Sequence, residues 1–306
     1  MASTRRGSGV PTIIDVARHA GVSIKTVSRV LNNEANVHAE TRQAVVAAVS
    51  ALKYRPKLSA RSLAGGRSFL IGLLYYAPSA AFVGAIQQGA TARCREAGLH
   101  VVVESLDTAP GSLAHQVEHM VSTLRVDGMI VTPPLCDNAK VLSVLRRHGT
   151  RCVLISPDVR RHGQPIVRMD DRHAAAEVVQ SLCAQGHRRI AFVQGDPAQA
   201  AALERRAGFE QAMRDAQLPV EPSLMRQGDF TFASGLREGH ALLARRLPPS
   251  AVFASNDDMA LGVLAAARER NVAVPAALSI IGFDDSPAAT LVSPALTSVR
   301  QPLFEM

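Results

Sequence analysis

Lys25 and Arg29 stand four residues apart near the amino-terminus, a spacing at which two side chains of one helix can act together. They lie in the segment GVSIKTVSRVLNN, residues 21–33, whose valines and leucine fall on a different face of the same predicted helix. Lysine and arginine donate hydrogen bonds to guanine O6 and N7, and the adjacent Ile24 can contact a thymine methyl group. The pattern therefore favours a helix with an apolar face packed on a core and a cationic face offered to nucleic acid.

The distribution of charge points to the same kind of partner. Residues 1–67 carry 11 basic and 3 acidic side chains, which accounts for the whole net charge of +8. Residues 68–306 carry 23 side chains of each sign and are neutral. A basic solubilising tail is the alternative, but the apolar positions of this segment are too periodic for a tail. A basic module beside a neutral body indicates a polyanion, and nucleic acid is the first candidate.

A short helix is expected just upstream of the cationic one. Its apolar residues follow the i, i+3, i+4, i+7 spacing of an amphipathic helix, at Ile13, Val16, Ala17 and Ala20. Thr12 is placed to cap this helix with Asp15 three residues later, and Gly21 is placed to end it.

Two further helices complete the predicted amino-terminal module. Ser23 can cap the second helix, which is expected to run to about Asn32. A third helix is expected from about Ala39 to Leu52, and it buries Val45, Val49 and Leu52. Two short helices joined by a glycine-containing turn form a helix-turn-helix.

In a helix-turn-helix the first residues of the second helix enter the major groove of DNA. Base reading is therefore expected from Ile24, Lys25 and Arg29. Hydroxyl and amide side chains nearby suit phosphate contacts, which fix the register without reading sequence; these are Ser23, Thr26, Ser28 and Asn32. A three-helix module that contacts another protein is the alternative.

A linker is expected after the third helix, over residues 56–67. Pro56 breaks the helix, residues 58–63 can form two short helical turns, and Gly65 and Gly66 stop them. A helix this short is marginal when isolated, so we expect it to form only when something holds it.

From residue 68 onward short apolar runs alternate with helical stretches. The runs are FLIGLLYY, HVVVES, GMIVTP, RCVLIS, RIAFVQG, AVFAS and LSIIGF. This alternation predicts parallel sheets with right-handed helical crossovers, that is, an α/β fold. The length suits two subdomains with a cleft between them, an N-subdomain of about 68–165 plus 297–306 and a C-subdomain of about 166–296.

Residues 12–74 resemble the DNA-binding headpiece and hinge of the lactose/galactose repressor (LacI/GalR) family. The resemblance rests on TIIDVARHAGVSIKTVSRVLNN, ETRQAVVAAVSALKYRPKLSARSL and IGLL. It implies a headpiece over 1–55 and a hinge helix that folds on the operator, wedging Leu63 into the minor groove with Arg61 beside it. One departure is His38, where members often carry a serine, and this is expected to weaken the cap of the third helix.

The resemblance continues through the body. DGMIVTPP, GHRRIAFVQGDP, RRAGFEQAM, FASNDDMALGVLAA, VPAALSIIGFDDSP and PALTSVRQP are similar to the family's effector-binding core, which has the periplasmic sugar-binding-protein fold. Ligands of open parallel sheets bind beyond the carboxyl ends of the strands. The residues implied in effector binding are Phe82, Arg205, Asn256 and Asp284. The alternatives to effector binding are structural: Asp284 could cap a turn, and Arg205 could be an exposed residue on the surface of a helix.

The opposite wall of the cleft departs from the family pattern. Many members have Asn-Pro-Phe after the first core strand, whereas this chain has Ala80 and Ala81 before Phe82. Tyr75 and Tyr76 precede this stretch and could stack on a sugar or simply belong to the core. Ala201 stands where several members carry Ser or Thr. The identity of the effector therefore does not carry over from the resemblance.

Other function classes find little support in the sequence. Four widely spaced cysteines without a CxxC pair indicate reduced thiols rather than zinc or a disulfide framework. The HxxEH pattern of His115, Glu118 and His119 matches an inverted zinc-peptidase motif, but nothing suggests a third ligand. No GxGxxG follows the first strand, no Walker loop or nucleophile elbow is evident, and we expect no enzyme and no cofactor.

The two ends of the chain and its location also carry expectations. No run approaches the roughly 18 apolar residues of a membrane span, and the amino-terminus lacks the apolar stretch of a secretory signal. A cytoplasmic protein is expected. The carboxyl-terminus is expected to be short relative to the family. The missing part often supports dimerisation in that family, so a weaker dimer would follow.

Taken together, the sequence predicts a transcriptional repressor with a helix-turn-helix headpiece and a two-subdomain parallel α/β core. It is expected to bind double-stranded operator DNA as a homodimer, with an affinity set by a small-molecule effector, a sugar or derivative. The alternative is a sugar-binding or sugar-active α/β protein with no specific DNA role.

Overall fold

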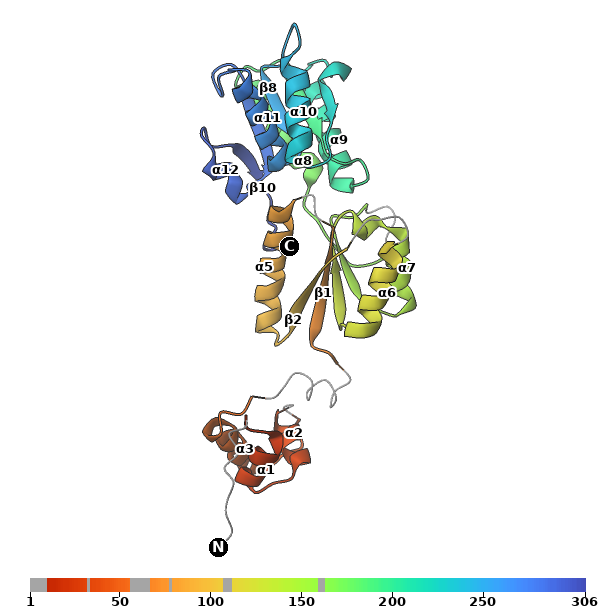
Figure 1. Cartoon of the computed structure of the whole chain (residues 1–306), viewed down its shortest axis with the longest axis vertical. Coiled ribbons are helices and arrows are strands. Elements are labelled where there is room, and N and C mark those ends of the chain that lie inside the picture. Colours follow the sequence, from red (N-terminus) through yellow and green to blue (C-terminus); the bar gives the residue numbers. More distant parts are fainter. Residues whose placement is uncertain (1–9, 32–33, 56–66, 77–78, 107–111, 159–162) are drawn as a thin grey trace. The chain divides into compact units, whose positions relative to one another are not determined.

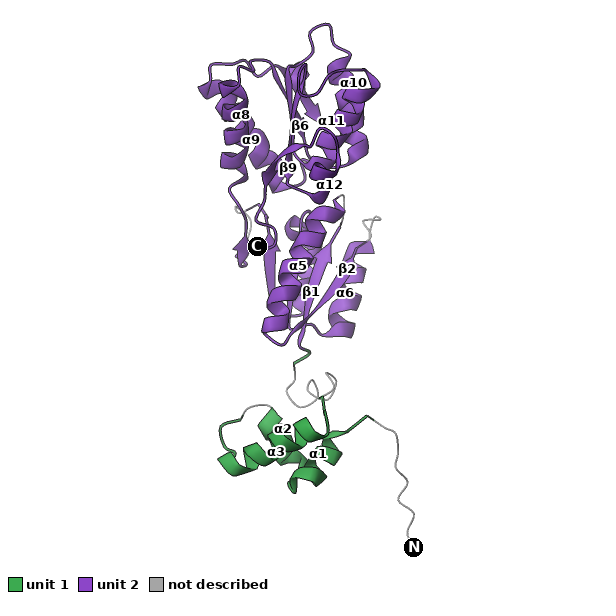
Figure 2. Ribbon diagram, turned by 90° about the vertical axis from the view of Figure 1, so that its left-hand side faces the viewer, with its two compact units in different colours: residues 1–68 green, residues 69–306 purple. Residues whose placement is uncertain are grey.

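The computed structural model describes residues 10–31, 34–55, 67–76, 79–106, 112–158 and 163–306. The chain divides into two compact units, residues 1–68 and residues 69–306 (Figure 2).

The first unit contains three short helices around a small apolar core. They are α1 (Ile13–Ala20), α2 (Ile24–Leu31) and α3 (Ala39–Ala51), in agreement with the sequence prediction. Each helix contributes a fully buried valine, at Val16, Val27 and Val45. Because so few side chains form this core, the helix ends must add to its stability.

The first helix has the predicted cap. The Thr12 side chain accepts from the backbone N–H of Asp15, and the Asp15 carboxylate accepts from the backbone N–H of Thr12 at 2.9 Å. The Thr12 hydroxyl also donates to Asp15 Oδ2 at 2.7 Å, and this hydrogen bond, with the one from the Thr12 backbone N–H, lowers the pKa of Asp15. Gly21 ends the helix at φ 65, in the left-handed region that favours glycine. His38 precedes α3 without capping it through its side chain, as predicted.

Substituting Thr12 by alanine is expected to destabilise the headpiece by about 1 kcal/mol, because the cap hydroxyl hydrogen-bonds both the backbone N–H and the carboxylate of Asp15. Amide hydrogen exchange of the intact protein measures this as lower protection of the α1 amides. Ser50→Ala, an exposed change near the end of α3, is the control and should leave that protection unchanged. Equal protection in the wild type and the Thr12 variant would contradict the role of the capping box.

The second unit contains two parallel five-stranded sheets (Figure 1). The first has the order β2-β1-β3-β4-β5. Its elements are β1 (Leu70–Tyr75), α5 (Ala80–Glu96), β2 (His100–Ser105), α6 (Ser112–Leu124), β3 (Gly128–Val131), the 3-10 turn η1 (Leu135–Asp137), α7 (Ala139–Arg147), β4 (Cys152–Ile155) and β5 (Ile166–Val167).

Opposite faces of this first sheet are covered by different helices. One face packs on α6 and α7 through alternate strand residues such as Met129 and Val131. On the other face Ile86 of α5 packs with Leu73 and Ile155. Side chains along a strand point alternately to the two faces of the sheet, and helices cover both faces. Both sets of side chains are therefore apolar, which explains why the strands are continuous apolar runs.

The second sheet has the order β10-β9-β8-β6-β7. Its elements are α8 (Asp171–Ala184), β6 (Ile190–Gln194), α9 (Ala200–Asp215), the 3-10 turn η3 (Pro222–Leu224), β7 (Met225–Gln227), α10 (Phe232–Leu243), β8 (Ala251–Ala254), α11 (Asp257–Glu269), β9 (Ser279–Asp284), α12 (Pro287–Leu291) and β10 (Thr297–Arg300). Helices α8 and α9 cover one face and α10 and α11 the other (Figure 2). This arrangement is the predicted α/β fold.

The strand pairing corrects the predicted boundaries between the subdomains. Residues 166–167 form β5 and pair with β4, so they belong to the first sheet and not to the C-subdomain. Residues 297–300 form β10 and pair with β9, so they belong to the second sheet and not to the N-subdomain. Leu303 then packs in the first subdomain. Sequence reasoning missed both strands because neither has the apolar run that identifies a buried strand.

Two other features bear on the predictions. Cys94, Cys136, Cys152 and Cys183 are free thiols. Among the described residues, no helix is long and apolar enough to cross a membrane.

Candidate functional site

The exposed surface of α2 carries the residues predicted to read bases. Lys25 and Arg29 are exposed, and the Ile24 side chain is also exposed although it is apolar. Val27 and Val30, on the other face, are buried against α1 and α3. The exposed Ile24 side chain is free to contact another molecule, but single exposed apolar side chains are common on protein surfaces.

The hydroxyl groups predicted to contact phosphate serve the start of this helix. Ser23 Oγ accepts from the backbone N–H of Thr26 at 3.1 Å and lies 2.9 Å from Thr26 Oγ1. Ser28 is half-buried. These contacts set the start of α2 and the orientation of the exposed backbone N–H groups there. Three further predicted DNA contacts, Asn32, Arg61 and Leu63, lie outside the described residues.

A pocket lies at the carboxyl ends of the strands of both sheets, and its empty space of about 540 Å³ includes open solvent. The first subdomain contributes Tyr76, Ser79, Phe82, Val83, Pro133 and Ser156, and the second contributes Gln199, Ala201, Arg205, Phe230, Asn256, Asp284 and Gln301. The four residues implied in effector binding by the resemblance are therefore brought together in one cavity.

Arg205 is buried and tightly held, so it is not a surface residue of α9. Its Nε donates to Asp171 Oδ1 at 2.8 Å, and its Nη1 donates to the backbone oxygen of Ser255. The guanidinium carbon lies 3.7 Å from the centre of the Phe283 ring. A guanidinium has five N–H donors, so some remain for a ligand in the pocket it lines.

Asn256 has both a structural and a pocket-lining role. Its Oδ1 accepts from the backbone N–H of Met259 at 3.0 Å, which caps α11. Its Nδ2 donates to the backbone oxygen of Phe230 at 3.0 Å. The amide is therefore fixed in orientation at the pocket wall.

Asp284 ends β9 in an unusual environment. Its backbone has φ 126, a strained conformation for a residue with a side chain. Burial raises its pKa from 3.8 to about 7, and the nearby Arg205 guanidinium opposes that rise. Gln301 donates from Nε2 to Asp284 Oδ1. A turn cap alone does not require a carboxyl group so buried, and the group can exchange hydrogen bonds with polar ligand atoms.

Several pocket residues were not found from the sequence. Gln301 directly follows β10, just as Asn256 lies shortly after β8 and Asp284 ends β9, and recognition of β10 would have revealed Gln301. Ser79 precedes α5 without capping it, and its hydroxyl hydrogen-bonds Asp258 of α11 in the other subdomain. No local sequence signal predicts a contact of this kind.

Tyr75 and Tyr76, for which the sequence left open a place in the pocket or in the core, differ in position. Tyr76 lines the pocket, together with Phe82 and Phe230, whereas Tyr75 is not among the lining residues. Ala201 also lines the pocket. The first subdomain thus lines the cavity mainly with apolar side chains, and both charged lining residues, Arg205 and Asp284, belong to the second.

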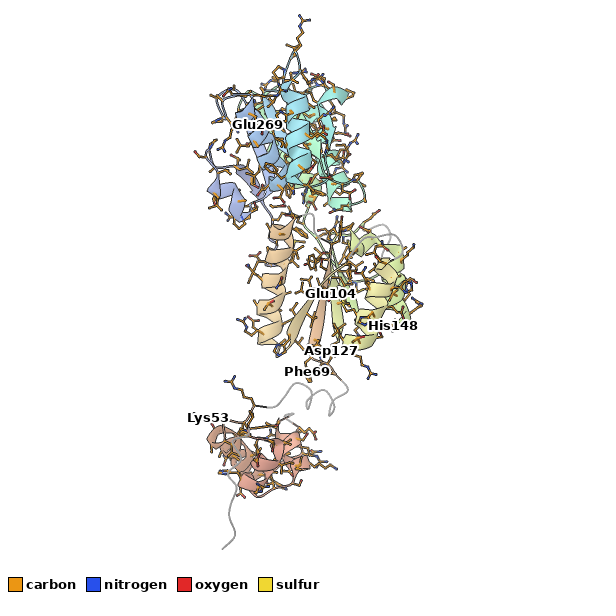
Figure 3. The ribbon with its side chains drawn as sticks, viewed as in Figure 1. Lys53, Phe69, Glu104, Asp127, His148 and Glu269 are labelled. Atoms are coloured by element: carbon orange, nitrogen blue, oxygen red, sulfur yellow. The ribbon has the colours of Figure 1, made fainter. Side chains whose placement is uncertain are left out.

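The glutamate of the HxxEH pattern on α6 contacts side chains at the end of α7. Glu118 forms an ion pair with Arg147 at 2.9 Å and a hydrogen bond with His148, which lies at the end of α7 (Figure 3). Its hydrogen bond from His148 lowers the pKa of Glu118. Within the described residues, no group of three or more His, Cys, Asp or Glu side chains is placed to hold a metal ion.

A helix-turn-helix headpiece and a two-sheet core with a pocket at the strand ends define a ligand-responsive DNA-binding protein. Residues 12–57 match the model of bacterial regulatory proteins of the lacI family, and residues 179–306 match the periplasmic binding protein-like domain.

Relatives match along nearly the whole chain. The transcriptional regulator DegA of Bacillus subtilis is 36% identical, with 96% of this chain and 88% of DegA covered. The lactose operon repressor of Escherichia coli is 33% identical over 95% of this chain and 80% of its own length. The structure of the lac repressor dimer bound to operator and the anti-inducer ONPF superposes with a TM-score of 0.80, at 29% identity, covering 97% of this chain and 89% of that one.

The chain belongs to the lacI family of bacterial regulatory proteins. It is a DNA-binding transcriptional regulator and not an enzyme, as the sequence predicted. The sugar-active alternative is set aside by the same matches.

Proposed function

We propose that this protein is a repressor that binds palindromic operator DNA as a homodimer in the cytoplasm and responds to a sugar or sugar derivative. The observation that carries the proposal is the surface of α2, where Lys25 and Arg29 are exposed while the valines behind them are buried. Two such helices in adjacent major grooves read two half-sites of a palindrome. The related lac repressor was solved as a dimer on its operator, which supports this assembly.

The proposal assigns base reading to Ile24, Lys25 and Arg29 and phosphate contacts to Ser23, Thr26, Ser28 and Asn32. It extends to Arg61 and Leu63 as minor-groove contacts, which lie outside the described residues. The effector occupies the pocket, where Phe82 offers an apolar surface and Arg205, Asn256 and Asp284 meet polar groups of the ligand. A ring with hydroxyl groups has both kinds of surface, and the related regulator CelR was solved in complex with cellobiose.

Selection of binding sites from random duplex DNA tests the DNA-binding part of this proposal. The wild type is expected to select a palindrome, while Lys25→Ala and Arg29→Ala lose about 1–3 kcal/mol of discrimination at the base pairs they read. Arg95→Ala, an exposed arginine of α5, removes the same charge from the second unit and should select the wild-type sequence. Failure of the wild type to select any sequence at moderate salt would end the proposal.

A further inference from the structure

Glu34, between α2 and α3, lies beside the base-reading surface. Its carboxylate oxygen Oε2 is 3.5 Å from Nε of Arg29, and both side chains are about half exposed. The other two acidic side chains of residues 1–67 are placed differently. Asp15 belongs to the α1 capping box, and Glu40 forms no ion pair with the described residues.

The backbone holds Glu34 in this position from both sides. Its N–H donates to the backbone oxygen of Arg29 at 3.0 Å, which satisfies a carbonyl group at the end of α2. Its own backbone oxygen accepts from Arg42 Nη2 of α3 at 2.6 Å. The side chain therefore starts from a fixed point next to Arg29, which reduces the entropy lost when the pair forms.

The pair engages the nitrogen of Arg29 that base reading does not need. Guanine O6 and N7 are bound by two parallel N–H donors, and the two terminal nitrogens of a guanidinium supply them. A carboxylate nearest to Nε, at 3.5 Å, leaves both terminal nitrogens available and attracts the guanidinium toward one orientation. An acidic residue that only competed with DNA would be expected at the terminal nitrogens instead.

We propose that Glu34 is a positioning residue that orients Arg29 for bidentate contact with guanine and so contributes to sequence specificity. This inference rests on the proposed function, because it requires that α2 reads bases. Glu34 also brings a negative charge close to the phosphates and weakens binding to every sequence to the same degree. Its net contribution therefore lies in the ratio of specific to non-specific affinity.

The test measures that ratio for the full-length protein on the selected palindrome and on a scrambled duplex of equal length. Glu34→Ala is expected to lower the ratio by about three- to tenfold, part of the discrimination that a bidentate pair provides. Glu34→Gln keeps an acceptor oxygen and should retain part of the ratio. Glu40→Gln removes the same charge from the same unit and should leave the ratio at its wild-type value.

Two further measurements separate orientation from a general effect of charge or folding. In an Arg29→Ala background, Glu34→Ala is expected to cause no additional loss of the ratio, since nothing remains to be oriented. Protection of the α1–α3 amides from hydrogen exchange should match the wild type in each Glu34 variant. A ratio that stays constant or rises in Glu34→Ala shows that Glu34 does not orient Arg29, and overturns the inference. If the wild type itself shows no sequence preference, the proposed function fails instead.

Discussion

Replacing Arg205 by methionine is expected to lower the free energy of unfolding of the second unit by about 3–5 kcal/mol, the usual cost of breaking a buried ion pair. The Asp171 and Arg205 side chains are only 6% and 5% exposed, so water cannot replace the lost guanidinium. The substitution also leaves the backbone oxygen of Ser255 without this donor and removes the cation above Phe283. Methionine retains much of the volume, which limits the contribution of a cavity.

Urea unfolding of the intact protein, followed by circular dichroism, measures this loss at neutral pH. Arg206→Met is a matched control, because it removes an identical group from the next position of the same helix. Arg206 pairs with Glu210 at 2.7 Å and donates to Gln194 Oε1 at 3.2 Å, but about half of its side chain is exposed, so a loss of about 1 kcal/mol is expected, well below that for Arg205.

A second substitution shows whether the stability lost in Arg205→Met comes from the unpaired Asp171 charge or from altered packing. Asp171→Asn in the Arg205→Met background removes the unpaired carboxylate and is expected to recover part of the stability. Equal losses for the Arg205 and Arg206 variants would show that water reaches Asp171 in the folded protein. In that case the buried pair would not be what holds α8 and α9 at the pocket.

The sequence predicted the headpiece helices closely because their signals are local. Thr12, Asp15 and Gly21 mark helix ends through their own backbone and side-chain chemistry, and these signals operate whatever the rest of the chain does. The apolar runs likewise predicted seven of the strands. Three strands, two-residue β5, three-residue β7 and polar β10, were missed because their existence depends on a neighbouring strand rather than on their own composition.

Prediction of the pocket depended on how its residues are placed in the chain. Asn256 and Asp284 follow strong apolar strands, so the rule that ligands bind at strand ends found them. The hydrogen bond of Ser79 with Asp258 joins two subdomains and has no sequence pattern. The same holds for the burial of Arg205, since helix periodicity cannot show that an arginine lies among α8, β8 and β9.

The second large effect concerns pH and the carboxyl group of Asp284. In the folded protein its pKa is raised to about 7, first by burial and further by the charges of Asp257 and Asp258, whereas in the unfolded chain it returns to 3.8. Between these two values the folded state binds more protons than the unfolded state. The stability that Asp284 contributes is therefore complete below about pH 4 and is lost as the pH rises through 7.

Asp284→Asn is expected to remove this dependence, because asparagine keeps the shape and the acceptor for Gln301 but does not ionise. The free energy of unfolding of the variant, relative to the wild type, should increase between pH 4 and pH 7 by up to about 4 kcal/mol, because the pKa of Asp284 is 3.8 in the unfolded chain and about 7 in the folded protein. Asp285→Asn, in the same loop but paired with Arg300 at 2.6 Å, controls for loss of one carboxyl group. Urea unfolding at half-unit pH intervals gives the curves. Parallel curves for the wild type and Asp284→Asn would mean that Asp284 is already ionised in the folded protein, so that Arg205 outweighs burial in setting the charge of the pocket.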